Sequence, residues 1–173
     1  MKKLIFALIV LVPLLTIETQ VSAQNSKKES KKEKKAKRQQ AVKQMLKDRN
    51  FVYHPTQATP MSGCTVQLDF SFSAKVHGDT LDSYMPYYGR AYHVDYGSNK
   101  GPFDFTLPIK DYKFEKVKDG YNVNFEVKKG QDNIKFNFHI SENGFANLTI
   151  ISTNRQSISY YGTVEKPAPE NAG

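Results

Sequence analysis

The sequence has no tryptophan and a single cysteine, Cys64, among its 173 residues. One cysteine excludes a disulfide scaffold and a zinc site built from several thiolates. No two of the four histidines stand at the spacing that places metal ligands on one helix face, so we predict no metal and no cofactor. The sequence also has no Gly-x-Ser-x-Gly nucleophile elbow and no glycine-rich phosphate loop. It therefore offers no catalytic residue.

A run of apolar residues long enough to span a bilayer is absent as well. The longest run, residues 4–15, falls short of the ~20 residues that a membrane span needs. Two lysines precede it and the small residues Val21-Ser22-Ala23 follow it, a pattern typical of a secretory signal peptide over residues 1–23. We expect cleavage after this peptide and a mature protein in the periplasm or cell envelope, or secreted. The alternative is an uncleaved membrane anchor.

Positive charge is concentrated in one segment. Residues 24–50 carry a net charge of +8, equal to that of the whole chain, whereas residues 51–173 carry a net charge of −1. A nearly neutral folded part argues against a nucleic-acid partner. We interpret residues 24–38 as a basic disordered arm that acts as a spacer, and binding to an anionic envelope surface is the alternative.

Helical spacing follows this arm. Apolar residues recur from Ala41 to Leu46 at the period of a helix, so we predict a helix over residues 30–49 that packs by its last two turns. Residues 54–63 contain two prolines and a glycine, and we interpret them as the linker between helix and sheet.

From residue 64 onward apolar and polar residues alternate, which is typical of strands with one buried face. We expect a mainly β (α+β) fold: one curved antiparallel sheet, a meander or half-barrel, with the N-terminal helix packed against it. Helix and sheet form a single domain over residues 39–164, and residues 165–173 are a disordered tail. The expected strands are residues 64–77, 103–109, 111–118, 121–128, 133–141, 145–152 and 158–164.

Two dipeptides and the cysteine give finer expectations. Asp119-Gly120 and Asn143-Gly144 stand between alternating runs, so we predict type I′ hairpin turns at both. Cys64 shares the parity of the apolar positions that follow it, and we predict a buried, unreactive thiol.

Tyrosine and arginine gather in residues 84–96 and 154–162. Amphipathic rings beside a fork-shaped guanidinium suit a glycan, peptide or protein ligand. We predict that the two stretches meet at one edge of the sheet as a single patch; the alternative is a tyrosine-rich turn that only packs over the end of the sheet. The predicted ligand-binding residues are Tyr84, Tyr87, Tyr88, Arg90, Tyr92, His93, Arg155, Tyr160 and Tyr161.

The same stretches carry a resemblance to a known family. PYYGRAY at residues 86–92 and NRQSISYYG at residues 154–162 resemble the two signatures of a bacterial domain-of-unknown-function family, number four-two-five-one, whose members are small exported proteins seen mainly in Bacteroidetes. Tyr88 stands where the family usually has Phe. The resemblance spans about residues 40–164 and implies an envelope location with no assigned activity.

Two functions are compatible with these observations. The first is a non-catalytic binding or interaction module of the cell envelope that uses the tyrosine and arginine patch. The second is a hydrolase of envelope polymer, with acids brought together by strand pairing. Clustered carboxyl groups with a raised pKa in a cleft would favour the hydrolase, and an aromatic-lined groove without them would favour the binding module.

Overall fold

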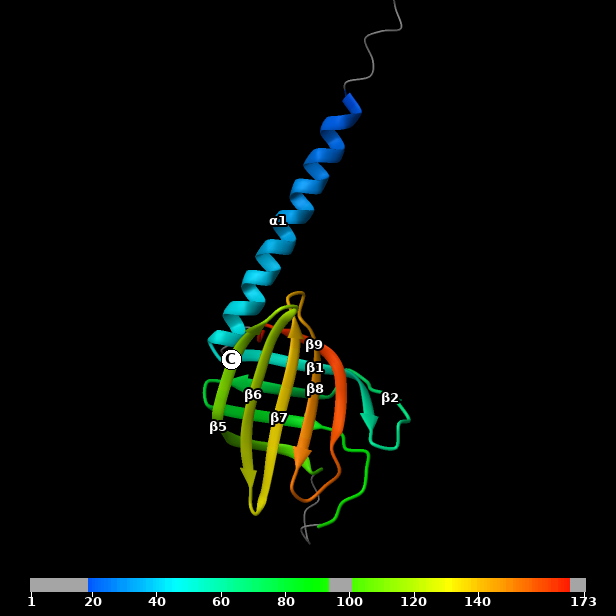
Figure 1. The fold of residues 1–173 in the computed structure, drawn as a ribbon, viewed down its shortest axis with the longest axis vertical. Coiled ribbons are helices and arrows are strands. Elements are labelled where there is room, and N and C mark those ends of the chain that lie inside the picture. Colours follow the sequence, from blue (N-terminus) through cyan, green and yellow to red (C-terminus); the bar gives the residue numbers. More distant parts are fainter. Residues whose placement is uncertain (1–18, 94–100, 169–173) are drawn as a thin grey trace, which may run out of the picture. The chain divides into compact units, whose positions relative to one another are not determined.

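The computed structural model describes residues 19–93 and 101–168. Within them, nine strands form one antiparallel sheet in the order β2-β1-β3-β4-β5-β6-β7-β8-β9, and β1 also pairs with β9. This additional pairing closes the sheet into a barrel of eight strands, and the short β2 lies beside β1 outside the ring (Figure 1). The predicted mainly β fold with an N-terminal helix is confirmed. The sheet closes into a full barrel and not into the half-barrel that was one of the expected forms.

The elements follow one another as a meander. The chain begins with α1 (Thr19–Lys47). The strands are β1 (Asn50–Pro60), β2 (Val66–Gln67), β3 (Ser73–His77), β4 (Thr80–Met85), β5 (Phe103–Val117), β6 (Gly120–Lys129), β7 (Asp132–Ser141), β8 (Phe145–Ser152) and β9 (Ile158–Glu165). From β4 to β9 each strand pairs with its predecessor, so within the described residues only the β1–β9 and β1–β3 pairings join strands that are not consecutive.

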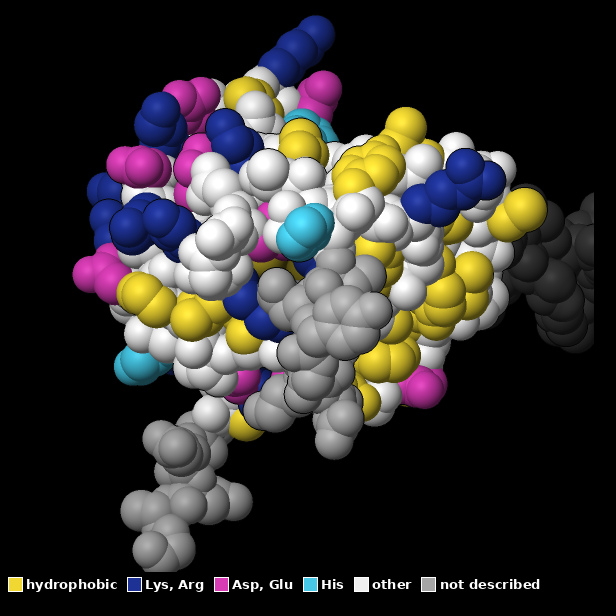
Figure 2. Space-filling view, turned by 90° about the horizontal axis from the view of Figure 1, so that it is seen from below, with side chains coloured by type: hydrophobic (Ala, Val, Ile, Leu, Met, Phe, Trp, Pro, Cys, Tyr) yellow, Lys and Arg dark blue, Asp and Glu magenta, His cyan; other side chains and the backbone are white. Residues whose placement is uncertain are grey.

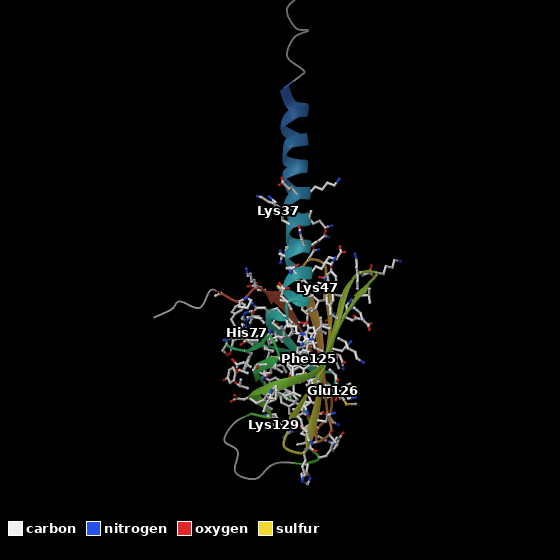
Figure 3. All side chains as sticks on the ribbon, turned by 90° about the vertical axis from the view of Figure 1, so that its left-hand side faces the viewer. Lys37, Lys47, His77, Phe125, Glu126 and Lys129 are labelled. Atoms are coloured by element: carbon white, nitrogen blue, oxygen red, sulfur yellow. The ribbon has the colours of Figure 1, made fainter. Side chains whose placement is uncertain are left out.

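Large side chains fill the interior of the barrel. Along β6 and β7 the inward side chains at alternate positions are buried. The Phe125 and Phe136 rings stack with centroids 5.2 Å apart, and Phe138 meets Tyr53 edge to face at 5.3 Å. Phe125 accordingly lies among the strands in Figure 3. Because an eight-stranded barrel is just wide enough for such side chains, a ligand has to bind on the outer wall or at an end.

The last turns of α1 close one end of the barrel. Val42, Met45 and Leu46 are buried with the core, and the Leu46 carbonyl accepts a hydrogen bond from Tyr112 Oη at 2.6 Å. The helix thus packs by its last turns, as the apolar spacing predicts. Lys47, at the end of α1, and Lys129, at the end of β6, lie at opposite ends of the barrel (Figure 3).

The first part of α1, up to Lys37, is a unit distinct from the rest. Glu33 and Lys37 form an exposed ion pair of 2.8 Å across one helical turn, a spacing that favours helix weakly. Residues 24–38, predicted to be a disordered arm, are helical throughout. The apolar run of the predicted signal peptide lies outside the described residues. No helix among the described residues has the length and apolar character needed to cross a membrane.

The single strand predicted over residues 64–77 is wrong. An Asx turn interrupts it, because the Asp69 carboxylate accepts hydrogen bonds from the backbone amide of Ser71, at 2.8 Å, and from its hydroxyl. Phe70 is consequently 88% exposed, and Cys64 is exposed in the turn before β2 rather than buried. Side-chain bonds of this kind compete with a strand for the same backbone groups, and alternation does not reveal them.

The linker predicted at residues 54–63 is also wrong, because most of it belongs to β1. A bulge between Pro55 and Gln57 adjusts the register against β9 where the proline has no amide hydrogen to donate. Opposite this bulge stands Gly162, where an added Cβ would lie 2.1 Å from the His54 carbonyl oxygen. Only glycine permits the two backbones to approach this closely.

Hairpins form at both predicted dipeptides, but not as type I′ turns. Type I′ requires a positive φ at both central residues, and neither Asp119 nor Asn143 has one. At the second hairpin the Gly144 amide donates to the Ser141 carbonyl at 2.9 Å, and Gly144 adopts a φ of 85°. The left-handed residue therefore follows the turn instead of lying within it.

The strands predicted at residues 103–109 and 111–118 are one continuous strand, β5. Asp111 has a φ of 53°, and the register against β6 shifts between Lys110 and Lys113. A bulge thus bends the strand without ending it.

Candidate functional site

The two tyrosine and arginine stretches meet at the end of the barrel opposite the docked turns of α1. Residues 86–93, which we call the end segment, run beside the loop between β8 and β9. The Gln156 amide donates to the Arg90 carbonyl at 3.1 Å, and the Arg90 amide donates to Gln156 Oε1 at 3.2 Å. Two further amides of the end segment donate to the Asn154 carbonyl at 2.8 and 3.3 Å. The backbone of the end segment is therefore fixed against this loop.

Asp132, the first residue of β7, fixes the loop itself. Its buried carboxylate accepts hydrogen bonds from Ser152 Oγ at 2.8 Å, from the amides of Thr153 and Asn154 at 2.9 and 3.3 Å, and from Arg155 Nη1 at 2.9 Å. The side chains of Asp132 and Arg155 are 3% and 11% exposed. The Arg155 guanidinium is therefore held inside the fold. The prediction that Arg155 contacts a ligand is wrong.

Two of the predicted ligand-binding tyrosines also hold the fold together. Tyr160 is buried inside the barrel, and its Oη donates to the Pro86 carbonyl. Tyr87 Oη lies 2.9 Å from the Arg90 carbonyl oxygen and 3.1 Å from that of Gln156. Burial raises the pKa of both phenols above the ordinary value, so both remain neutral donors near pH 7. They attach the end segment to the barrel.

Four predicted residues of the end segment are exposed to solvent: Tyr88, Arg90, Tyr92 and His93. We call them the aromatic end. Among the tyrosines that the structure describes, Tyr92 is the most exposed, at 68%. No carboxylate of the described residues pairs with the Arg90 guanidinium. The aromatic end thus combines three rings and one cation on a backbone that is fixed by hydrogen bonds.

The remaining two predicted residues lie on the outer wall, away from the aromatic end. Tyr84 on β4 stacks on Phe72 with ring centroids 5.3 Å apart. Tyr161 on β9 stacks on Phe145 with centroids 6.3 Å apart. The strands β1 and β3 stand between β4 and β9 in the sheet. The structure therefore does not join all nine predicted residues into one patch.

Hydrophobic and charged side chains occupy different sides of this end. In Figure 2 hydrophobic side chains gather on the side where β1, β2 and β9 lie, and lysines and arginines with acidic partners gather on the side of β5 and β6. Glu126 is an acidic residue of β6. Hydrogen bonds from Asn133 and Lys135 lower its pKa.

Sequence reasoning missed Asp132 and Gln156. Asp132 looks like an ordinary turn residue, but it has the parity of Ile134 and Phe136 and therefore faces the interior. A carboxylate at an inward position needs a cationic or multiple hydrogen-bonding partner, so the parity of β7 could have indicated a buried polar network. Its partner Arg155 could not have been found this way, because it stands in a loop.

A groove of about 430 Å³ lies between the last turns of α1 and the end of β9, with Ala41, Met45 and Val164 in its lining and Arg38 and Lys166 also beside it. Among the residues that the structure describes, no three His, Cys, Asp or Glu side chains are grouped so that they could hold a metal ion.

Comparison with known proteins gives a family and a fold. A family model described as "Domain of unknown function (DUF4251)" matches residues 33–164. Among solved structures, the chain is similar to the crystal structure of a DUF4251 family protein from Bacteroides eggerthii DSM 20697, with 17% identity and a TM-score of 0.56. The match covers 75% of this chain and 87% of that chain. A search of curated proteins found no match.

Proposed function

The chain belongs to the DUF4251 family, whose description assigns no activity, and on this premise we propose that it is an exported, non-catalytic binding protein of the cell envelope. The family membership agrees with the resemblance of the two signature stretches. Export is supported by the signal-peptide pattern of residues 1–23. The binding role is supported by the end of the barrel opposite α1.

The observation that carries the proposal is the aromatic end. Exposed aromatic rings tend to lower the solubility of a protein, and side chains that face solvent contribute little to its stability. Here they are presented on a segment whose backbone is fixed by Gln156, Asn154 and the buried Tyr160. A binding surface of this kind needs little ordering when its ligand arrives.

The chemistry of these side chains favours a ligand that carries a carboxylate. The planar guanidinium of Arg90 fits a carboxylate in a bidentate manner, and the rings of Tyr88 and Tyr92 offer flat surfaces to a sugar or a peptide plane. A carboxylate-bearing glycan or peptide of the envelope satisfies both requirements.

The alternative, a hydrolase, has less support. A general acid needs a carboxyl group whose pKa is raised toward the working pH. Among the carboxyl groups of the described residues, those of Asp69 and Glu126 have shifted pKa values, and hydrogen bonds to the ionised form lower both. Neither group is suited to donate a proton near pH 7.

Co-sedimentation with purified peptidoglycan sacculi tests the binding role, because this polymer combines sugar rings with carboxylates. We expect the mature protein to sediment with sacculi, and Arg90→Ala to weaken the interaction at least tenfold. Lys116→Ala is the matched control. It also removes one exposed cation, but from the last residues of β5, at the end of the barrel away from the aromatic end. Equal losses for the two variants would mean that only net charge matters and would contradict the assignment of the aromatic end.

We also propose that residues 24–38 attach the protein to an anionic surface. Eight lysines and arginines stand among these residues against two acids, and each basic side chain contributes about 1 kcal/mol to binding near an anionic membrane. Deletion of residues 24–38 should abolish salt-sensitive binding to phosphatidylglycerol vesicles and leave sacculus binding intact. Vesicle binding that survives the deletion would place the attraction elsewhere.

A further inference from the structure

The outer wall of the barrel carries two parallel rows of polar side chains that cross β1, β9, β8, β7 and β6. Strand pairing places the members of each row side by side. The first row consists of Gln57, Tyr161, Asn147, His139 and Asn122. The second row consists of Thr59, Ser159, Thr149, Asn137 and Asn124. We call these ten residues the amide wall.

None of the ten residues is Lys, Arg, Asp or Glu. The surface of a soluble domain carries roughly 25–35% of such residues, so about three would be expected among ten outward positions. Charges do occupy the outer wall elsewhere: Lys75 on β3 stands opposite Asp82 on β4, and Lys113 on β5 stands opposite Asn124 on β6. The absence of charge is therefore a property of this wall and not of the whole barrel.

Asparagine is an unusual choice for these positions. It is depleted in β-strands, whereas threonine is enriched there. The amide wall nevertheless has Asn122, Asn124, Asn137 and Asn147 at outward strand positions. Since strand propensity does not favour asparagine, its repeated use on one wall points to a role in binding.

Much of the hydrogen-bonding capacity of the wall is unused. His139 and Asn122 bond to each other at 2.9 Å, and Thr149 and Ser159 at 3.1 Å. Within the part of the chain that the structure describes, the side-chain amides of Asn124, Asn137 and Asn147 bond to no protein group. Each amide offers two donors and one acceptor, which complements a ligand rich in hydroxyl groups.

A flat apolar surface adjoins the first row. The rings of Tyr161 and Phe145 are stacked within 6° of parallel, and both are nearly half exposed. Such rings accept the C–H face of a sugar ring, while the neighbouring amides bond to the hydroxyls at its edge. This combination suits a sugar better than a protein partner, which would call for a more apolar centre.

We infer that the amide wall binds an extended, uncharged polysaccharide. Absence of charge on the wall matches absence of charge on the ligand, and neighbouring strands lie about 4.8 Å apart, close to the length that one sugar adds to an extended β-linked chain. Successive sugars can therefore meet successive strands of a row. This site is separate from the aromatic end, which would bind a carboxylate.

Affinity electrophoresis in native gels tests this inference. Gels containing hydroxyethylcellulose, laminarin or mannan should retard the wild-type protein for at least one polysaccharide. The double variant Asn137→Ala/Asn147→Ala should lose at least tenfold in affinity. Because asparagine and alanine are both uncharged, the mobility in a gel without polysaccharide stays the same. Thermal unfolding of the variant confirms that the exposed substitutions leave the barrel folded.

Two controls locate the site. Asn133→Ala removes an outward asparagine from the same strand, β7, outside the two rows, where it bonds to Glu126. This variant and Arg90→Ala should both be retarded as much as the wild type. The inference is overturned if none of the three polysaccharides retards the protein, or if Asn133→Ala loses as much affinity as the double variant. Neither result would affect the sacculus experiment on the aromatic end.

Discussion

The end segment and residues 154–162 have similar compositions, each with two adjacent tyrosines, one glycine and one arginine, yet the barrel uses them differently. In the end segment Arg90 and Tyr88 face solvent, whereas in residues 154–162 Arg155 and Tyr160 are buried among partners. The end segment presents side chains to the outside, and the second stretch holds the end segment in place.

This difference shows that residues of the same type can have different roles in the two stretches. Tyr160 and Tyr161 are neighbours in the chain, but one is 1% and the other 42% exposed, because successive side chains of a strand point to opposite faces. Arg155 is buried because Asp132 faces inward beside it. The position of a residue in the barrel, and not the composition of its stretch, decides whether its side chain stabilises the fold or faces solvent.

Of the substitutions that test this comparison, removal of the Asp132 carboxylate should decrease the free energy of unfolding most. Asp132→Ala leaves the Arg155 guanidinium and several loop donors without their acceptor, and a broken buried ion pair costs about 3–5 kcal/mol. We expect a decrease of that size in the free energy of unfolding by urea denaturation. Lys135→Ala, which breaks the more exposed pair with Glu126, should cost less than about 1 kcal/mol. If the two variants lose equal free energies of unfolding, the hydrogen bonds of Asp132 are not what holds residues 154–162 in place.

Alkaline pH should separate the buried tyrosines from the exposed ones. Burial raises the pKa of the Tyr53, Tyr112 and Tyr160 phenols in the folded protein above the ordinary value of 10.0. The unfolded chain therefore binds fewer protons than the folded chain as the pH rises past 10, so stability is intact below this pH and falls above it. Phenolate absorbance should show exposed tyrosines titrating reversibly and the buried ones only upon unfolding. A single common transition near pH 10 would contradict the burial.

Removing the hydroxyl group should change stability differently at two buried tyrosines, Tyr160 and Tyr53. Tyr160→Phe loses the bond to the Pro86 carbonyl and should cost about 1 kcal/mol. Tyr53 Oη has no hydrogen-bond partner among the described residues, so Tyr53→Phe should leave stability unchanged or raise it. Denaturation midpoints of the two variants measure this difference. If Tyr53→Phe is the more destabilising variant, the hydroxyl of Tyr53 has a partner after all.

Truncating the aromatic end should have the smallest effect on stability. Arg90→Ala and Tyr92→Ala remove exposed side chains, and substitutions of this kind usually change the free energy of unfolding by less than about 0.5 kcal/mol. Differential scanning calorimetry should find melting temperatures near that of the wild type. A marked destabilisation by either variant would assign the aromatic end to the fold and remove the main argument for binding.

Prediction from sequence worked where the signal is periodic. The alternation in residues 121–128, 133–141 and 145–152 identifies β6, β7 and β8 almost to the residue, because a half-buried strand requires this pattern. It failed where a local interaction overrides the pattern. Asp69 turns the chain inside an alternating run, and Pro55 stands within a strand that accommodates it by a bulge.

The candidate site was predictable only in part. The meeting of the two stretches was predicted from their similar composition and their places at strand ends, and the structure brings residues 86–93 beside residues 154–156. Their division into supporting and exposed side chains could not be predicted, because it depends on Asp132 and Gln156, which reach them across β7 and the β8–β9 loop. The amide wall was also invisible, since its members come from five strands.

The sequence by itself determined the strands from β6 to β9, the helix that ends near Leu46 and the concentration of positive charge before residue 51, because these depend on residues close together in the chain. The tertiary structure alone decided that β1 pairs with β9 and closes the barrel. It also decided that Arg155 is buried and Arg90 exposed. Such outcomes depend on which distant groups share the interior, and the free energy of burying a charge is set by the partner that it meets there.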